Sequence, residues 1–180
     1  MNFIIYDLEA TCWQGINRPD NQEIIEIGAI MINGYGEVLS DFDRFVQPVI
    51  HPQLSAFCTE LTSITQDQVN RASKFVEVVE DFQDWAKVFE ENYLLCSWSG
   101  FDKHVLANNC IMHDMDHEWA YQHIDLKKQY QKIKKRKSPI GLKNAVQKEG
   151  FEFTGIQHRA IADAENLAKI FLRYLDEWVY

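Results

Sequence analysis

The spacing of apolar and polar positions divides the chain into short strands and amphipathic helices. Apolar runs and period-two alternation predict strands over residues 2–7, 23–32, 37–47, 93–97 and 123–126. Apolar positions three and four residues apart predict helices over residues 74–90, 102–112, 141–148 and 159–180. Thr65 fits the N-cap of one further helix. Three strands followed by β-α-β units predict an α/β fold with a mixed five-stranded sheet and helices on both faces.

Two carboxylates, Asp7 and Glu9, stand at the end of the first predicted strand. Residues i and i+2 of a strand face the same side, so both side chains emerge together while Leu8 packs on the other side. The apolar run before them indicates the buried centre of a sheet, where paired negative charges repel each other and are poorly solvated. The tripeptide therefore predicts a site that a proton or a divalent cation neutralises.

Length and composition indicate one folded domain over residues 1–180, with 46% apolar residues and a formal net charge of −9. The longest apolar runs fall far short of the roughly 20 residues that cross a bilayer. The first residues lack the positive region of a signal peptide. The cysteines are widely spaced and form no C-x-x-C pair, so we expect reduced thiols in a cytoplasmic protein: Cys12, Cys58, Cys96 and Cys110.

One basic segment departs from this acidic character, because residues 127–137 hold 7 of the 18 Lys and Arg residues. The net charge alone argues against a general nucleic-acid binder, whose surface is usually basic, but a focused basic segment can still attract a polyanion. The segment follows a predicted strand that ends near Asp125. It is either a solvated loop or helix end, or a phosphate-binding element that uses Lys134, Lys135, Arg136 and Lys137.

Three further residues complete a candidate site when they are taken together. Asp102 opens a predicted helix after a strand, Asp163 lies one turn inside the last helix, and His158 precedes that helix. Alone, Asp163 fits a surface acid favoured by the helix dipole, and His158 is one of six histidines. Four carboxylates can hold two hard cations about 4 Å apart, an arrangement that cleaves phosphodiesters. A neutral histidine nearby can accept the proton of the attacking water.

Three segments resemble, in order, the three motifs of the DEDDh branch of the 3′–5′ exonuclease superfamily: Y-D-L-E-A-T at 6–11, S-W-S-G-F-D-K-H-V-L at 97–106 and H-R-A-I-A-D-A-E-N-L-A at 158–168. The middle motif departs from the usual pattern, because Ser97-Trp98 stands where His-Asn is common. With E-I-I-E-I-G-A at 23–29 and F-C-T-E-L-T-S-I-T-Q at 57–66, this departure is similar to the subgroup that contains histone-mRNA 3′-end exonucleases and KapD-like bacterial proteins.

The resemblance implies an RNase H-like fold and a site for two divalent cations, Mg²⁺ or Mn²⁺. It places Asp7 between both ions, Glu9 and Asp163 at the first ion, and Asp102 at the second. It gives His158 the role of general base. The implied reaction is hydrolysis of the terminal phosphodiester at the 3′ end of single-stranded RNA or DNA, with RNA favoured. The products would be nucleoside 5′-monophosphates.

The resemblance also implies contacts with the substrate. By position, Trp98 and Phe57 are similar to residues that stack on the terminal bases. Ordinary core packing is the alternative for both, but stacking is favoured for Trp98, because Trp replaces a polar residue of the motif. The backbone at Ala10 and Thr11 is placed near the terminal ribose by similarity alone.

Two other functions are compatible with these residues. One is a domain of the same fold that has lost catalysis and binds nucleic acid or a protein partner. Binding alone does not require a general base or a full set of metal ligands, which disfavours this alternative. The other is an endonuclease or a different phosphoesterase built on the same metal site. We expect a monomer, because one core accounts for the predicted apolar positions.

Overall fold

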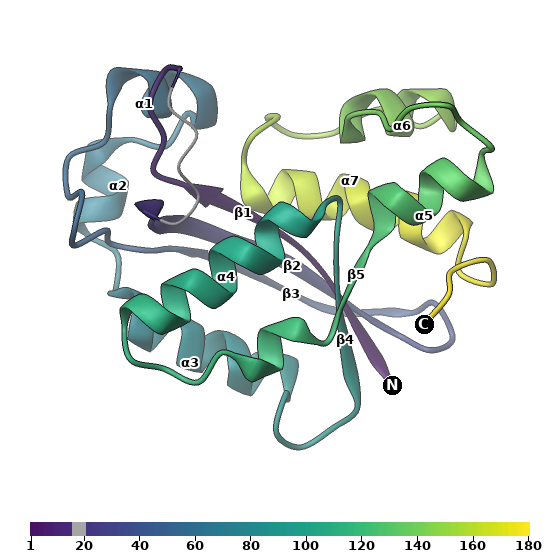
Figure 1. The fold of residues 1–180 in the computed structure, drawn as a ribbon, viewed down its shortest axis with the longest axis horizontal. Coiled ribbons are helices and arrows are strands. Elements are labelled where there is room, and N and C mark those ends of the chain that lie inside the picture. The colour runs from purple at the N-terminus through teal and green to yellow at the C-terminus, as the bar shows by residue number, and fades with distance from the viewer. Residues whose placement is uncertain (16–20) are drawn as a thin grey trace.

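The computed structural model describes residues 1–15 and 21–180, which form a sheet flanked by helices (Figure 1). The strands are β1 (Asn2–Ala10), β2 (Ile24–Asn33), β3 (Val38–Phe45), β4 (Tyr93–Ser97) and β5 (His123–Asp125). They lie in the order β3-β2-β1-β4-β5. Neighbours pair antiparallel from β3 to β1 and parallel from β1 to β5. The predicted mixed five-stranded sheet is confirmed.

The central strand β1 continues beyond the predicted end at residue 7. Its register with β2 runs through Asp7 opposite Gly28 and Glu9 opposite Glu26, so both carboxylates belong to the strand itself. Its register with β4 ends earlier, at Ile5. The last part of β1 is therefore paired with β2 on one side, while its other side faces the region where the acidic residues gather.

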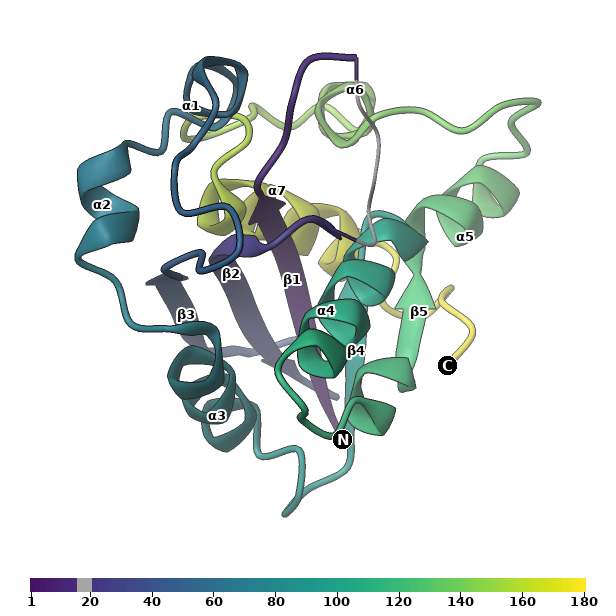
Figure 2. The same ribbon diagram turned by 60° about the vertical axis from the view of Figure 1, so that its left-hand side comes forward.

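Helices cover both faces of the sheet, as predicted (Figure 2). They are α1 (Ala56–Thr62), α2 (Gln66–Asn70), α3 (Phe75–Ala86), α4 (Gly100–Met112), the 3-10 helix η2 (Glu118–Tyr121), α5 (Leu126–Ile133), α6 (Leu142–Lys148) and α7 (Ala160–Arg173). Helices α3 and α4 pack on one face, and α5, α6 and α7 pack on the other. Helices α1 and α2 lie beyond the carboxyl end of β1 (Figures 1 and 2).

The alternation of side chains along β1 divides the core into two layers. Ile4, Tyr6 and Leu8 pack toward α3 and α4. Phe3 and Ile5 pack toward α5, α6 and α7. The prediction that Leu8 packs on the side opposite the carboxylates is confirmed. Because odd-numbered residues of β1 face α7, the carboxylates that follow Ile5 emerge beside the start of that helix.

Local capping explains where several helices begin and end. Thr65 caps α2 with a reciprocal capping box, as expected. Helix α1, which Ser55 caps, was not predicted, because its buried residues, Cys58 and Thr62, do not form an apolar periodic pattern. Helix α7 ends at Arg173, earlier than predicted, because the chain then folds back over it. The indole N–H of Trp178 donates to the carbonyl of Phe171 at 2.9 Å, and the two rings stack.

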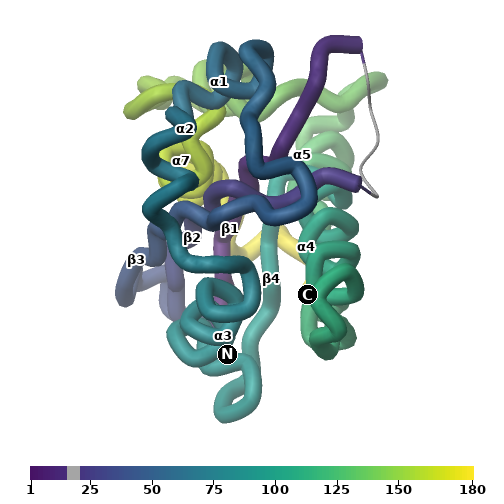
Figure 3. The backbone as a smooth tube through the Cα atoms, turned by 90° about the vertical axis from the view of Figure 1, so that its left-hand side faces the viewer, coloured from purple at the N-terminus to yellow at the C-terminus, as the bar shows by residue number. Residues whose placement is uncertain are grey.

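The two ends of the chain lie near each other (Figures 1 and 3). The rings of Phe3 and Tyr180 are 4.7 Å apart, which ties the last residues to the first strand. All four cysteines are free thiols, and all except Cys12 are buried. In the part of the chain that the structure describes, every helix is too short or too polar to span a membrane.

Candidate active site

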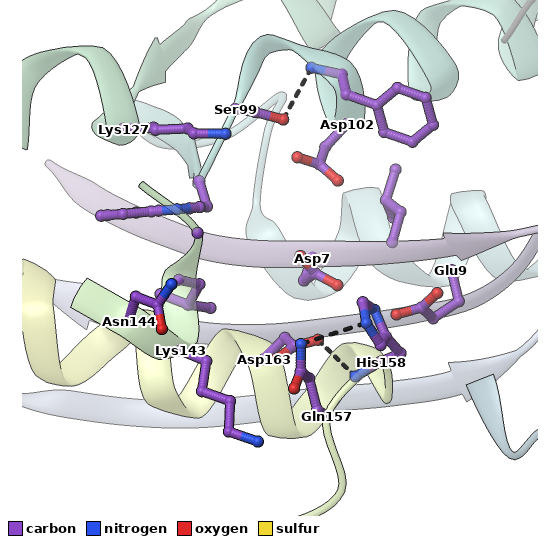
Figure 4. A pocket seen from close by; sticks show the side chains of 15 residues that line it. Asp7, Glu9, Ser99, Asp102, Lys127, Lys143, Asn144, Gln157, His158 and Asp163 are labelled. Carbon is purple, nitrogen blue, oxygen red and sulfur yellow. Dashed lines mark hydrogen bonds between the residues drawn. The ribbon is translucent and has the colours of Figure 1, made fainter. Parts of the chain in front are cut away.

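A pocket of about 450 Å³ at the carboxyl end of β1 gathers all five predicted catalytic residues. Asp7 and Glu9 come from β1, Asp102 from the first turn of α4, His158 from the turn before α7, and Asp163 from the first turn of α7 (Figure 4). The volume lies within the range of about 300–1,000 Å³ that is typical of small-ligand sites. The fold therefore brings both halves of the chain to one place.

Asp102 reaches this pocket because α4 starts directly after β4. Ser99 is the N-cap, and its side chain accepts a hydrogen bond from the backbone N–H of Phe101 at 3.2 Å. Strand β4 is parallel to β1, so the helix that follows it begins at the same edge of the sheet as the β1 carboxylates. In the first turn of α4, Asp102 is only 5% exposed.

The turn before α7 holds His158 against the other residues of the pocket. Its backbone N–H donates to the carboxylate of Asp163 at 2.9 Å. The backbone of His158 is in the left-handed region, with φ at 63°, which bulky side chains rarely adopt. One ligand atom each from Glu9, His158 and Asp163 lie within 4.8 Å of one another. The imidazole therefore points toward the carboxylates (Figure 4).

Burial raises the pKa of every acid in the pocket. It is the main reason that the pKa of Asp7 and of Glu9 lies well above the ordinary value, and the neighbouring negative charges add to it. Burial also raises the pKa of Asp102 and of Asp163 to about 6. Hydrogen bonds to their ionised forms partly oppose this increase. Four acids held together in this way require a positive counter-charge to stay ionised.

The residues present fit divalent cations. Carboxylate oxygens are the preferred ligands of Mg²⁺ and Mn²⁺. Glu9, His158 and Asp163 have the close spacing of a metal site, and Asp7 and Asp102 supply further oxygens in the same pocket. The chemistry of the donors and the raised pKa values of the acids point to the same conclusion. The pocket is suited to a divalent-metal centre.

Behind the pocket lies a buried ion pair that the sequence did not reveal. Glu26 on β2 is fully buried and accepts three hydrogen bonds, at 2.7–3.2 Å, from the guanidinium group of Arg159. It also accepts one from the backbone N–H of Ala160 at 2.8 Å. Glu26 lies opposite Glu9 in the sheet, so Arg159 offsets the charge of a neighbouring acid. The pair fixes the start of α7, and with it His158.

Gly28 on β2 permits α7 to start so close to the sheet. A Cβ at this position would lie 2.1 Å from the backbone nitrogen of Ile161. Gly28 belongs to the segment 23–29, which the sequence marked as a motif without assigning roles to its members. The role of Gly28 depends on a helix more than a hundred residues later in the chain, so no local pattern could have indicated it.

The two predicted stacking residues lie in different places. Trp98 lines the pocket but is only 7% exposed; its indole N–H donates to the carbonyl of Ile140 at 3.1 Å, and its ring packs on Tyr130. Phe57 on α1 is 36% exposed and lines a separate hollow with Leu61. Stacking of bases on Trp98 and Phe57 stays a prediction.

The predicted ribose contacts belong to backbone that is already hydrogen-bonded. The N–H of Thr11 donates to the carbonyl of Glu23 at 2.8 Å, and its carbonyl accepts from the side chain of Gln22 at 2.8 Å. Ala10 is buried at the end of β1. A ribose contact at Ala10 or Thr11 stays a prediction.

Within the basic segment 127–137, one lysine connects helices and another lines the pocket. Lys134 donates to the hydroxyl of Tyr174 at 3.0 Å and pairs with Glu149 at 3.1 Å, so it connects helices. Lys127 lines the pocket, together with Lys143 from α6, which the sequence did not single out. The described residues that line the pocket do not include the four for which phosphate binding was predicted, Lys134, Lys135, Arg136 and Lys137. Their contact with substrate stays a prediction.

This fold and this acidic pocket are typical of nucleases that use divalent metals. The family model described as Exonuclease (RNase_T) matches residues 4–171. The chain is 36% identical to ERI1 exoribonuclease 2 from Danio rerio over 97% of its own length and 35% of that relative's length. It is 29% identical to Probable 3′-5′ exonuclease KapD from Bacillus subtilis, over 94% of this chain and 82% of the relative.

The solved nuclease domain of 3′hExo, described as a DEDDh family member bound to rAMP, matches this structure with a TM-score of 0.87. The two are 32% identical, over 98% of this chain and 92% of that one. The chain therefore belongs to the exonuclease family. Its predicted resemblance to DEDDh exonucleases and KapD-like proteins is confirmed, and so is the RNase H-like fold. The chain spans about a third of the length of the vertebrate relatives that are named ERI1 exoribonuclease 2.

Proposed function

We propose that this protein is a divalent-metal-dependent 3′–5′ exonuclease acting on single-stranded nucleic acid, with RNA favoured over DNA. It would release nucleoside 5′-monophosphates one at a time. The observation that carries the proposal is the convergence of four acids and His158 in a single pocket. A relative named as an exoribonuclease and a similar structure bound to rAMP support the preference for RNA.

When bound, divalent cations activate the attacking water and stabilise the leaving oxygen. His158 would accept the proton of that water. Burial lowers the pKa of His158, which favours the neutral imidazole, the form that can take a proton. The hydrogen bond from its backbone to Asp163 keeps the ring beside the acids. The residues that would hold the cations are Asp7, Glu9, Asp102 and Asp163.

The proposal extends to a monomeric protein in the cytoplasm that uses Mg²⁺ or Mn²⁺. The hard oxygen donors of the pocket support these metals. The four free thiols support a reducing compartment. Two core layers on the faces of one sheet support the assignment of residues 1–180 to a single exonuclease domain.

A time course with 5′-labelled RNA and DNA oligomers of equal sequence tests this function. We expect stepwise shortening from the 3′ end with Mg²⁺ or Mn²⁺ and none with EDTA. Asp7→Asn should abolish shortening and leave the melting temperature no lower than that of the wild type. Asp67→Asn is the matched control, because Asp67 is largely exposed on α2 and its loss should leave activity unchanged.

Activity that survives in Asp7→Asn would overturn the assignment of the site. A circular single-stranded oligomer separates the exonuclease from an endonuclease on the same residues, because an exonuclease has no end at which to start. Cleavage of the circle would favour the endonuclease.

A further inference from the structure

Two lysines border the pocket, and neither has an acidic partner among the described residues. Lys127 lies in the first turn of α5 and Lys143 in the first turn of α6, and both line the pocket. The ion pairs formed within residues 1–15 and 21–180 involve other side chains. Figure 4 shows both lysines on the same side of the carboxylates, with Asn144 between them. Two uncompensated positive charges therefore border an acidic site in a protein of net charge −9.

The lysines occupy the rim of the pocket, whereas the acids occupy its base. Asp102 and Asp163 are 5% and 7% exposed, while Lys127 is partly exposed and Lys143 is exposed. Lys143 lines the same pocket as His158 and the four acids. A nucleic-acid strand whose 3′ end lies at the acids passes Lys127 and Lys143 when it leaves the pocket on their side.

The wall that carries the lysines is firmly attached to the rest of the protein. The indole N–H of Trp98 donates to the carbonyl of Ile140, just before α6, and the Trp98 ring lies 5.4 Å from the ring of Tyr130 on α5. The hydroxyl of Tyr130 donates to Glu149, just after α6, at 2.6 Å. Lys134 binds the same carboxylate. The rim is therefore built on ordered helices rather than on a loop.

We infer that Lys127 and Lys143 bind phosphates on the 5′ side of the scissile bond, so that a single strand leaves the pocket across the wall formed by α5 and α6. This inference rests on the proposed function and names the surface that holds its substrate. An ammonium group binds phosphate as a point charge, and each contact releases a counterion from the nucleic acid. Lys127 belongs to the basic segment 127–137 predicted from the sequence, but the surface uses Lys143 in place of the four residues named there, Lys134, Lys135, Arg136 and Lys137.

Steady-state kinetics on a single-stranded RNA of ten nucleotides, at several salt concentrations, test the inference. The variant Lys127→Ala/Lys143→Ala should raise KM on the order of tenfold and leave kcat within about twofold of the wild type. The slope of log(kcat/KM) against log[salt] should become shallower by about 1.4, since each phosphate contact on a single strand contributes about 0.7. The melting temperature should change little, because neither side chain forms an ion pair among the described residues, and Lys143 loses only its contact with the ring of Phe153, 5.9 Å away.

The matched control is Lys74→Ala/Lys148→Ala, which removes the same charge from exposed positions that neither line the pocket nor belong to the basic segment 127–137. Its KM and salt slope should equal those of the wild type. Equal effects in the two variants would overturn the inference. They would indicate that the overall charge of the protein attracts the RNA, without specific contacts at Lys127 and Lys143. A dinucleotide has only the scissile phosphate, so the Lys127→Ala/Lys143→Ala variant should cleave it with the KM of the wild type. A KM for the dinucleotide raised as much as for the longer RNA would also overturn it.

If the proposed exonuclease function is wrong, the result differs from that expected when only the inference about the lysines is wrong. In that case the wild type would release no mononucleotides with either metal. Fluorescence anisotropy with the same RNA and Ca²⁺ measures the salt slope of binding without turnover, so the lysines can be tested even then. A slope that is the same in the wild type and in Lys127→Ala/Lys143→Ala would count against the surface, whatever the activity.

Discussion

Arg159→Met would leave Glu26 as an uncompensated charge inside the protein. Glu26 is fully buried and would lose three hydrogen bonds from the guanidinium group, keeping only that from the backbone of Ala160. Removal of one partner from a buried ion pair costs about 3–5 kcal/mol. The side chain of Arg159 is 21% exposed, so water reaches part of the site. We therefore expect a loss near the lower end, about 3 kcal/mol in the free energy of unfolding.

Urea unfolding and thermal melting measure this loss. For a chain of this size, 3 kcal/mol corresponds to a fall of about 6–12 °C in melting temperature. Arg71→Met is the matched control, because the pair that Arg71 forms with Asp67 is largely exposed. An exposed pair contributes about 0–1 kcal/mol, so the control should lose little. Equal losses in Arg159→Met and Arg71→Met would refute the reasoning.

A double variant separates the buried charge from the packing of the arginine. Glu26→Gln in the Arg159→Met background removes the charge but keeps an acceptor for the N–H of Ala160. Much of the lost stability should return. If the double variant is less stable than Arg159→Met, the loss came instead from contacts of the side chain, such as that with the ring of Phe45 at 5.0 Å.

Three further predictions concern the surroundings of the site. Gly28→Ala places a Cβ 2.1 Å from the backbone of α7; unfolding should show a loss of roughly 1–3 kcal/mol, and mononucleotide release should fall with it. Lys134→Met removes an ion pair and a hydrogen bond between helices; its melting temperature should fall with kcat and KM unchanged, and a raised KM at unchanged stability would favour substrate contact instead. In EDTA the pKa of Asp102 and of Asp163 is about 6 when folded and about 4 when unfolded. Protons therefore bind the folded state more tightly, and melting temperature should rise as pH falls from 7 toward 5 and level off below about 4; a profile that falls over this range would contradict it.

Residues with local patterns could be predicted from the sequence. Asp7 and Glu9 follow an apolar strand, and alternation alone places both on one face. Asp102 could be assigned because a strand ends just before its helix, which sends the first turn to the carboxyl edge of the sheet. The mixed character of the sheet followed from a meander and later β-α-β units, although the order of its strands was not predicted. In each case, the spacing along the chain determines the position in the fold.

Residues whose roles depend on distant partners could not be predicted. Glu26 and Arg159 are separated by 133 positions, and nothing near either residue shows that they meet. Lys134 looks like its basic neighbours in sequence, yet its partner Glu149 is placed by the packing of α5 against α6 and α7. Lys143 has no basic neighbours to mark it, and only the fold places it beside the acids.

The left-handed backbone at His158 limits which substitution can be used to crystallise the protein with uncleaved substrate. Asparagine and glycine tolerate a positive φ better than other residues, whereas valine or isoleucine would be strained there. His158→Asn thus removes the imidazole and spares the turn whose N–H is bound to Asp163. A β-branched replacement would disturb that turn as well. The site in the resulting complex would then differ in geometry from that of the wild-type enzyme.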